Sequence, residues 1–311
     1  MRLRSTALAT VAALAFLAPA CTLSGGTHPD GDVPPTGPGQ RGRVLAVKID
    51  NVGPARPQTG LGAADVVYAE QVEAGLSRLM AVYATRVPPV VGPVRSARET
   101  DLELLRQFGS PTLAYSGAQS KLHPLIESAP LRALSPGKAP ADAYYRGTTR
   151  PAPHNLFLRP AALKSAPSAG SLADTGFRFG PRPAGGTPKT RATVRFPAAR
   201  FTFDWVEYEG RWRVSMDGRR ARTTDSGEVA PATVVIQYVT VRQSRFHDRS
   251  GNNSPFSETV GSGRAQVLRD GRAYDARWDR PAPDDGTGFT TPDGEPLPFA
   301  KGQVWVVFAK A

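Results

Sequence analysis

The sequence predicts an α+β protein: an N-terminal α/β domain with a βαβ core over residues 41–165, then a smaller, mainly antiparallel β domain over 191–311. Two observations support this prediction. In the first part, apolar runs of strand length alternate with a helical pattern, whereas the second part contains short strand-like runs separated by turn signals. Between them, residues 166–190 are rich in Gly, Pro and Ser, which favours a linker or a large exposed loop.

The predicted βαβ core consists of a strand over 79–84, a helix over 96–108 and a strand over 112–116. Ser96 and Glu99 have the spacing of a capping box, which places the helix start at Ser96. The apolar stripe of this helix is Leu102, Leu105 and Phe108. Gly109 then favours the left-handed conformation that closes a helix, and Pro111 prevents its continuation.

Further elements are predicted on both sides of this core. A first strand is expected at 44–49, and residues 65–73 fit either a strand or a helix, with the strand favoured. A helix is expected over 119–128 and a strand over 144–146.

The second part reads as a series of short strands. Turn signals such as Asp217-Gly218 and Asp270-Gly271 separate them. Residues 244–262 are predicted to form a long polar loop between two of these strands. The expected strands are 192–196, 201–208, 211–216, 233–241, 265–268, 273–278 and 303–308.

The N-terminus resembles a secretion signal. Residues 1–20 combine two arginines with a short apolar stretch, and the only cysteine of the chain, Cys21, follows Ala20. The pattern favours a bacterial lipoprotein signal in which Cys21 is lipidated, followed by a disordered tether over 21–40; a secretory signal without lipid is the alternative. The expected location is the extracytoplasmic face of the cell membrane, with the membrane as a partner through the lipid anchor.

The chain is basic, with 39 Lys and Arg against 27 Asp and Glu and a formal net charge of +12. Outside the cytoplasm this charge is not expected to serve nucleic acid. Anionic lipid head groups and phosphate-rich envelope polymers are the available polyanions, and a charge that only aids solubility is the alternative.

Three arginines form the candidate anion site: Arg78, Arg95 and Arg98. Arg95 and Arg98 flank the predicted helix start, where free backbone N–H groups and guanidinium groups can bind phosphate, sulfate or carboxylate. The alternative is that these arginines pair with nearby acids of the same helix.

Other polar residues complete the candidate cleft. They are Asp50, Asn51, Glu70, Glu73, His154 and Asn155. Glu70 and Glu73 suit acid/base or metal chemistry, but a solvated face or pairing with Arg78 is the favoured interpretation. His154 suits a general base, but capping a turn or bonding a backbone carbonyl is favoured for it. The long loop of the second part adds Arg245, His247 and Asp248. No complete zinc, P-loop or Ser-His-Asp signature is present, so no metal site is predicted and the sequence identifies no cofactor.

Several motifs together resemble the YerB-like bacterial lipoproteins, a family of unknown function with an N-terminal and a C-terminal part. The first part carries Ile49-Asp50-Asn51, Ala55 to Gly60 (ARPQTG), Ala64 to Tyr68 (ADVVY), Glu73 to Arg78 (EAGLSR), Gly92 to Arg98 (GPVRSAR) and Pro153-His154-Asn155. The second part carries Gly261-Ser262-Gly263, Asp270-Gly271, Trp278 and Gly302 to Trp305 (GQVW). The resemblance covers nearly all of residues 41–311 and implies an envelope lipoprotein without an established reaction.

The order of motifs also looks like that of the LytR-CpsA-Psr phosphotransferases, which bind polyprenyl-pyrophosphate sugars through arginines. Ser96 follows Arg95 where that family carries an Arg-Asp pair. Three functions therefore compete: binding of a phosphate-bearing envelope ligand, a metal-assisted phosphotransferase or hydrolase, and a protein-interaction scaffold. Convergence of the acids Asp50, Glu70 and Glu73 with the three arginines would favour the first two.

Overall fold

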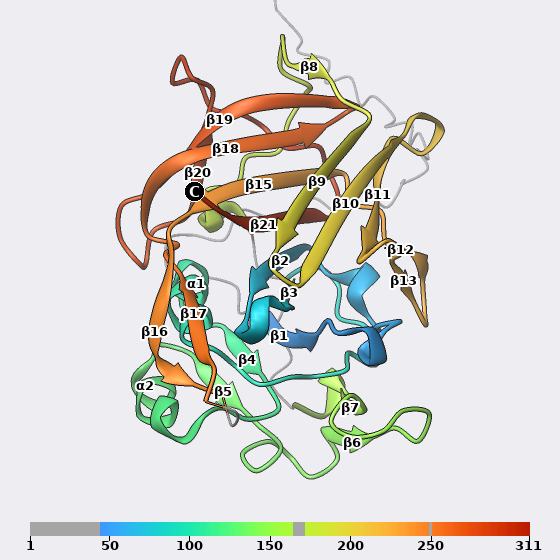
Figure 1. Ribbon diagram of the computed structural model, residues 1–311, viewed down its shortest axis with the longest axis vertical. Helices are drawn as coiled ribbons and strands as arrows, with labels where there is room; N and C mark the ends of the chain where they lie inside the picture. Colours follow the sequence, from blue (N-terminus) through green and yellow to red (C-terminus); the bar gives the residue numbers. More distant parts are fainter. Residues whose placement is uncertain (1–43, 164–171, 249–250) are drawn as a thin grey trace, which may run out of the picture. The chain divides into compact units, whose positions relative to one another are not determined.

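The computed structural model describes residues 44–163, 172–248 and 251–311 (Figure 1). The predicted signal peptide, Cys21 and the tether over 21–40 lie outside these described residues, as does part of the predicted linker. All the described residues belong to one compact unit. No helix among them is long and apolar enough to cross a membrane.

Eleven of the described strands form one mixed sheet, in the order β20-β19-β18-β15-β21-β2-β3-β1-β4-β5, with β8 also paired to β19. Its strands are β1 (Leu45–Asp50), β2 (Val66–Gln71), β3 (Ser77–Tyr83), β4 (Thr112–Ala114), β5 (Arg132–Leu134), β8 (Thr187–Pro188), β15 (Thr233–Val239), β18 (Gly261–Arg269), β19 (Arg272–Arg280), β20 (Gly288–Thr290) and β21 (Val304–Lys310). The C-terminal strand β21 lies between β2 and β15 and is parallel to both. The two parts of the sequence therefore share one sheet.

The remaining strands form smaller sheets. A four-stranded sheet contains β9 (Arg191–Phe196), β10 (Ala199–Val206), β11 (Arg211–Met216) and β12 (Arg219–Arg220). The two-stranded pairs are β6 (Tyr144–Arg146) with β7 (Leu156–Leu158), β13 (Arg222–Thr223) with β14 (Gly227–Glu228), and β16 (Val241–His247) with β17 (Asn253–Ser257). The described α-helices are α1 (Glu99–Leu104) and α2 (His123–Ser128).

The two faces of the large sheet pack against different layers. Alternate residues of β1, such as Leu45 and Val47, join a core shared with the apolar face of the four-stranded sheet, where Phe201 and Phe203 pack edge-on against Trp305. The intervening residues face a second core that includes α1 and α2. The period of two along each strand thus separates two cores.

The fold is mainly β, so the prediction of an α/β first part is only partly met. The predicted βαβ unit around α1 is wrong, because β3 runs antiparallel to β1, whereas β4 runs parallel to β1 on its other side. The parallel pair joined by a helix is instead β4 and β5, connected through α2. Local patterning located these strands, but their directions depend on the pairing with β1.

Two further expectations are corrected in detail. Helix α1 begins at Glu99, and the Asp101 carboxylate accepts the backbone N–H of Arg98 at 2.7 Å, so the predicted Ser96–Glu99 capping box is wrong. The carbonyl oxygen of Ser96 instead accepts hydrogen bonds from the side chains of Arg78 and Arg98, and the helix begins three residues later. The predicted loop over 244–262 is also wrong in large part, because β16 and β17 pair as a hairpin there.

Candidate functional site

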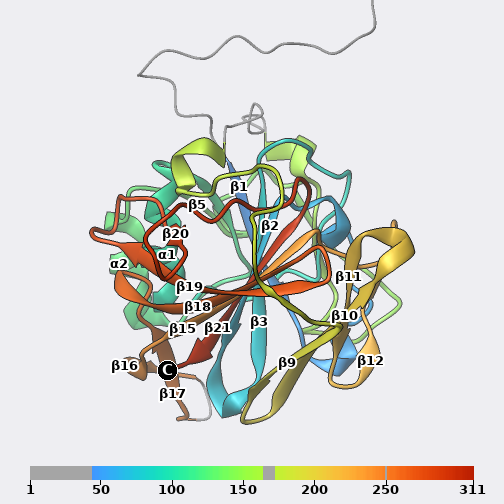
Figure 2. The ribbon, with the colours of Figure 1, turned by 90° about the horizontal axis from the view of Figure 1, so that it is seen from above.

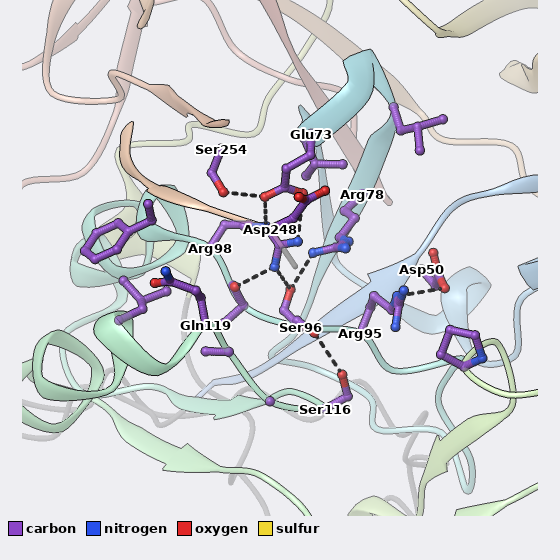
Figure 3. A pocket seen from close by; sticks show the side chains of 18 of the residues that line it. Asp50, Glu73, Arg78, Arg95, Ser96, Arg98, Ser116, Gln119, Asp248 and Ser254 are labelled. Carbon is purple, nitrogen blue, oxygen red and sulfur yellow. Dashed lines mark hydrogen bonds and ion pairs between the residues drawn. The ribbon is translucent and has the colours of Figure 1, made fainter. Parts of the chain in front are cut away.

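The described residues enclose a cavity of about 650 Å³ on the face of the large sheet that carries α1 (Figure 3). Its walls come from the end of β1, the turn between β2 and β3, the segment before α1, the segment after β4 and the β16–β17 hairpin. Five of the six side chains expected to converge line this cavity: Asp50, Glu73, Arg78, Arg95 and Arg98.

Arg78 occupies the centre of the charged row on the sheet. On neighbouring strands it lies opposite Asp50 on one side and Glu70 on the other. Its side chain is 9% exposed, and Nη1 donates to the Ser96 carbonyl oxygen at 3.0 Å. Among the described residues no ion pair joins Arg78 to a carboxylate. Burial, reinforced by the charges of Arg98 and Arg95, lowers the pKa of Arg78 to about 9.

Arg95 and Asp50 form a more open part of the site. Arg95 Nε lies 3.2 Å from Asp50 Oδ2, and the arginine side chain is 26% exposed. The same carboxylate oxygen lies 2.8 Å from Nδ1 of His154. In the neutral imidazole, Nδ1–H then donates to Asp50 and Nε2 is the basic nitrogen. His154 comes from the loop between β6 and β7 and is not among the residues that line the cavity.

The hydrogen bonds of the Arg98 side chain go to other groups of the protein. Its Nε and Nη2 donate to the two carboxylate oxygens of Glu73 at 2.5 and 2.7 Å, and Nη1 donates to the Ala97 carbonyl oxygen at 2.9 Å. The Ser254 hydroxyl also donates to Glu73. Burial opposes the ionisation of Glu73, but the Arg98 bonds and charge lower its pKa to about 2. Arg98 therefore forms an ion pair within the protein, but its partner Glu73 lies in the turn between β2 and β3 and not in the helix, as the alternative interpretation had expected.

Glu70 lies outside the cavity lining, contrary to the expected convergence. Its carboxylate contacts Lys48, whose Nζ also donates to Asp101 at 2.7 Å, and all three side chains are buried. Burial lowers the pKa of Lys48 to about 8, although Asp101 favours its charged form. This cluster ties β1 and β2 to α1. Lys48 was missed because a single lysine in an apolar strand has no motif of its own.

Asn51 and Asn155 also have structural partners. The Asn51 side chain donates to the Ser77 hydroxyl and accepts from Arg56 and Gln58. Asn155 Oδ1 accepts from Arg146 Nη1 at 2.7 Å.

Arg146 itself lines the cavity, which sequence reasoning missed. Its place at the end of the predicted strand 144–146 was the available signal. Like Arg78, it donates to a neutral oxygen in the described part of the chain.

The second part of the chain reaches the site through the β16–β17 hairpin. His247 and Asp248 line the cavity, whereas Arg245 does not and instead lies 5.2 Å from the centre of the Phe246 ring. Asp248 accepts hydrogen bonds from the backbone and side-chain N–H groups of Asn252. Two of the three residues expected from this region therefore line the cavity, and the region is a hairpin instead of a free loop.

The described part of the chain has no ready set of metal ligands. The described residues include no group of three or more His, Cys, Asp or Glu side chains arranged to hold a metal ion. Glu70 and Glu73 already neutralise Lys48 and Arg98, so neither acid offers a free carboxylate. The arrangement offers a nearly buried guanidinium group at the cavity wall, Arg78, a second one nearer solvent, Arg95, and the Asp50–His154 pair beside them.

Comparisons with known proteins match most of the chain. The family model "Protein of unknown function (DUF3048) N-terminal domain" matches residues 33–173, and the corresponding "C-terminal domain" model matches residues 192–306. A protein named "Putative lipoprotein YerB" from Bacillus subtilis (strain 168) is 25% identical over 281 residues, covering 85% of this chain and 80% of the relative. The crystal structure of the YerB protein from Bacillus subtilis aligns with a TM-score of 0.74 at 20% identity, over 87% of this chain and 91% of that chain.

Proposed function

We propose, from the premise that this chain belongs to the DUF3048 family of proteins of unknown function, that its cavity binds the anionic group of a phosphate-bearing envelope ligand. One observation carries the proposal. Arg78 is a nearly buried guanidinium group at the cavity wall, and it forms no ion pair with any described residue. Arg95 and Arg98 add positive charge beside it. A buried charge without a direct ion pair is costly, since Glu73 and Asp50 act on Arg78 only from a distance, and a bound anion would supply a direct partner.

Phosphate fits this cavity better than a single carboxylate does. Arg78, Arg95 and Arg146 approach from different elements, so several donors can share the oxygens of one dianion. Arg98 instead holds the wall in place through Glu73.

The test is titration of inorganic phosphate and pyrophosphate into the wild type and Arg95→Gln. Arg95 is partly exposed, so this variant should fold, yet binding should weaken by about 10- to 150-fold, as expected for one charge-assisted hydrogen bond. Arg106→Gln is the matched control, because Arg106 is an exposed arginine paired with Asp284 away from the cavity. Absence of pyrophosphate binding by the wild type, or an equal loss in the control, would refute the anion site.

Membrane attachment is the second element of the proposal. We infer that Cys21 is lipidated after cleavage of residues 1–20 and that residues 21–40 tether the folded part to the extracytoplasmic face of the membrane. The name of the Bacillus subtilis relative supports this inference. Cys21→Ala should move the protein from the membrane fraction to the soluble fraction, and retention with a cleaved signal would contradict lipid anchoring.

Phosphotransfer or hydrolysis is the alternative, and the Asp50–His154 contact favours it. Asp50 orients the imidazole so that Nε2 can act as a general base beside the arginines. In this alternative, His154→Gln should abolish turnover of a phosphate ester or pyrophosphate-lipid mimic and leave its binding unchanged. Binding without turnover in the wild type would favour the non-catalytic function.

A further inference from the structure

A second basic surface lies on the solvent side of the four-stranded sheet. Alternate residues of β9, β10 and β11 fill the core on one side, so the intervening residues face outwards. The outward-facing arginines are Arg191, Arg195, Arg200, Arg211, Arg213 and Arg220.

The two ends of this surface differ in charge balance. At one end, Arg191 pairs with Asp204 and Arg213 pairs with Glu209. At the other end, Arg195 lies directly opposite Arg200 on the neighbouring strand, an arrangement of like charges that destabilises a sheet. Neither of these two arginines has an ion pair among the described residues.

Hydroxyl side chains lie next to the end of the surface that carries Arg195 and Arg200. The next row across the sheet is Thr193, Thr202, Ser215 and Arg220. The two threonine hydroxyls lie 3.2 Å apart. We call Arg195, Arg200 and Arg220 with these hydroxyl residues the arginine face. None of the large exposed apolar side chains of the described chain belongs to it.

The arginine face belongs to the layer on the opposite side of the large sheet from the cavity, and the β9–β10 turn at its end contacts the rim of the cavity. Arg195 and Arg200 flank the β9–β10 turn, and the N–H of Ala198 in that turn donates to the Gly75 carbonyl oxygen at 2.9 Å. Ala74 and Leu76, on either side of Gly75, line the cavity. Figures 1 and 2 both show the tip of the β9–β10 hairpin beside the turn between β2 and β3.

We propose that the protein binds a linear phosphate polymer, with a terminal phosphate in the cavity and the following units along the arginine face. The first half of this proposal rests on the proposed function, and the second half rests on the arginine face alone. Guanidinium groups pair with phosphates along the polymer, and the hydroxyls between them hydrogen-bond to its oxygens. A polymer fits better than a membrane surface, because the face presents arginines and hydroxyls with no apolar side chain to insert into a bilayer.

The experiment compares pyrophosphate with long-chain inorganic polyphosphate. The wild type should bind the long chain at least about tenfold more tightly, and this gain should fall with salt as bound counterions are released. Arg195→Gln/Arg200→Gln should remove the gain and leave pyrophosphate binding unchanged. The matched control, Arg191→Gln/Arg211→Gln, removes the same charge from the other end of the same sheet and should change polyphosphate affinity by less than about threefold.

The possible outcomes distinguish the anion site in the cavity from polymer binding on the arginine face. Equal losses in the two double variants, or no preference for the long chain, would overturn the polymer proposal. Polyphosphate binding that depends on Arg195 and Arg200, without any pyrophosphate binding, would refute the cavity site while supporting the arginine face. A loss of binding to vesicles of anionic lipid in Arg195→Gln/Arg200→Gln, with unchanged polyphosphate binding, would identify a membrane surface instead and overturn the proposal.

Discussion

Acid should destabilise this protein through Glu73, the residue that fixes Arg98 at the cavity wall. The Glu73 side chain is 6% exposed and accepts two hydrogen bonds from Arg98 and one from Ser254. Protonation would remove the charge that these bonds require. The substitution Glu73→Gln imitates the protonated state at every pH.

The size of the effect follows from the pKa. Burial opposes ionisation of Glu73, yet the bonds and charge of Arg98 lower its pKa from 4.5 to about 2. Because the folded state binds its proton less tightly than the unfolded state, the stabilisation is complete above pH 4.5 and is lost as the pH falls towards 2. The full difference corresponds to about 3 kcal/mol, of which about 2 kcal/mol is lost by about pH 3.

Urea unfolding of the wild type and Glu73→Gln between neutral pH and about pH 3 measures this difference. At neutral pH the variant should be less stable by about 3 kcal/mol or more, because Arg98 loses its counter-charge in a partly buried site. This gap should shrink by about 2 kcal/mol at about pH 3. Glu127→Gln is the control, because Glu127 pairs with Lys138 in solvent. This variant should have the same dependence of the unfolding free energy on pH as the wild type. Parallel pH profiles for the wild type and Glu73→Gln would refute this role of Glu73.

Three further outcomes are expected. Gly75→Ala should destabilise the protein by about 2–4 kcal/mol in urea unfolding, because its φ is +71° and a Cβ would lie 2.5 Å from a proline side chain of the β9–β10 turn; a neutral effect would contradict this close approach. Lys48→Met should cost about 3–5 kcal/mol, because Glu70 and Asp101 would remain buried without their cation; a loss below about 1 kcal/mol would show that Lys48 does not neutralise these two acids. Proteolysis within residues 166–190 should leave two fragments that co-elute in gel filtration, because β21 pairs with β2; separation of the fragments without denaturant would contradict the shared sheet.

Local chemistry explains the parts of the fold that sequence reasoning predicted. Asp217-Gly218 and Asp270-Gly271 have positive φ at both residues, as the predicted two-residue hairpin turns require. The ambiguous segment over 65–73 is a strand, β2, and the helix and strand expected at 119–128 and 144–146 are present as α2 and β6. In each case the signal lies within a few neighbouring residues.

The errors come from interactions between distant residues. At the predicted start of α1, the Ser96 carbonyl oxygen is bound by Arg98 and by Arg78 of β3, a partner that the local pattern does not reveal. The parallel pairing of β21 with β2 joins segments more than 200 residues apart, and no local pattern encodes such a partner.

The same distinction between local and distant interactions applies to the candidate site. The sequence by itself determined which residue types were available, since the motifs around Arg78, Arg95 and Arg98 were visible without any structure. Only the tertiary structure decided their different roles: Arg98 is neutralised by Glu73, whereas Arg78 lies at the cavity wall without an ion pair in the described chain. The physical reason is that backbone conformation depends on a residue and its neighbours, while the charge balance of a buried group depends on whichever strands the fold brings beside it.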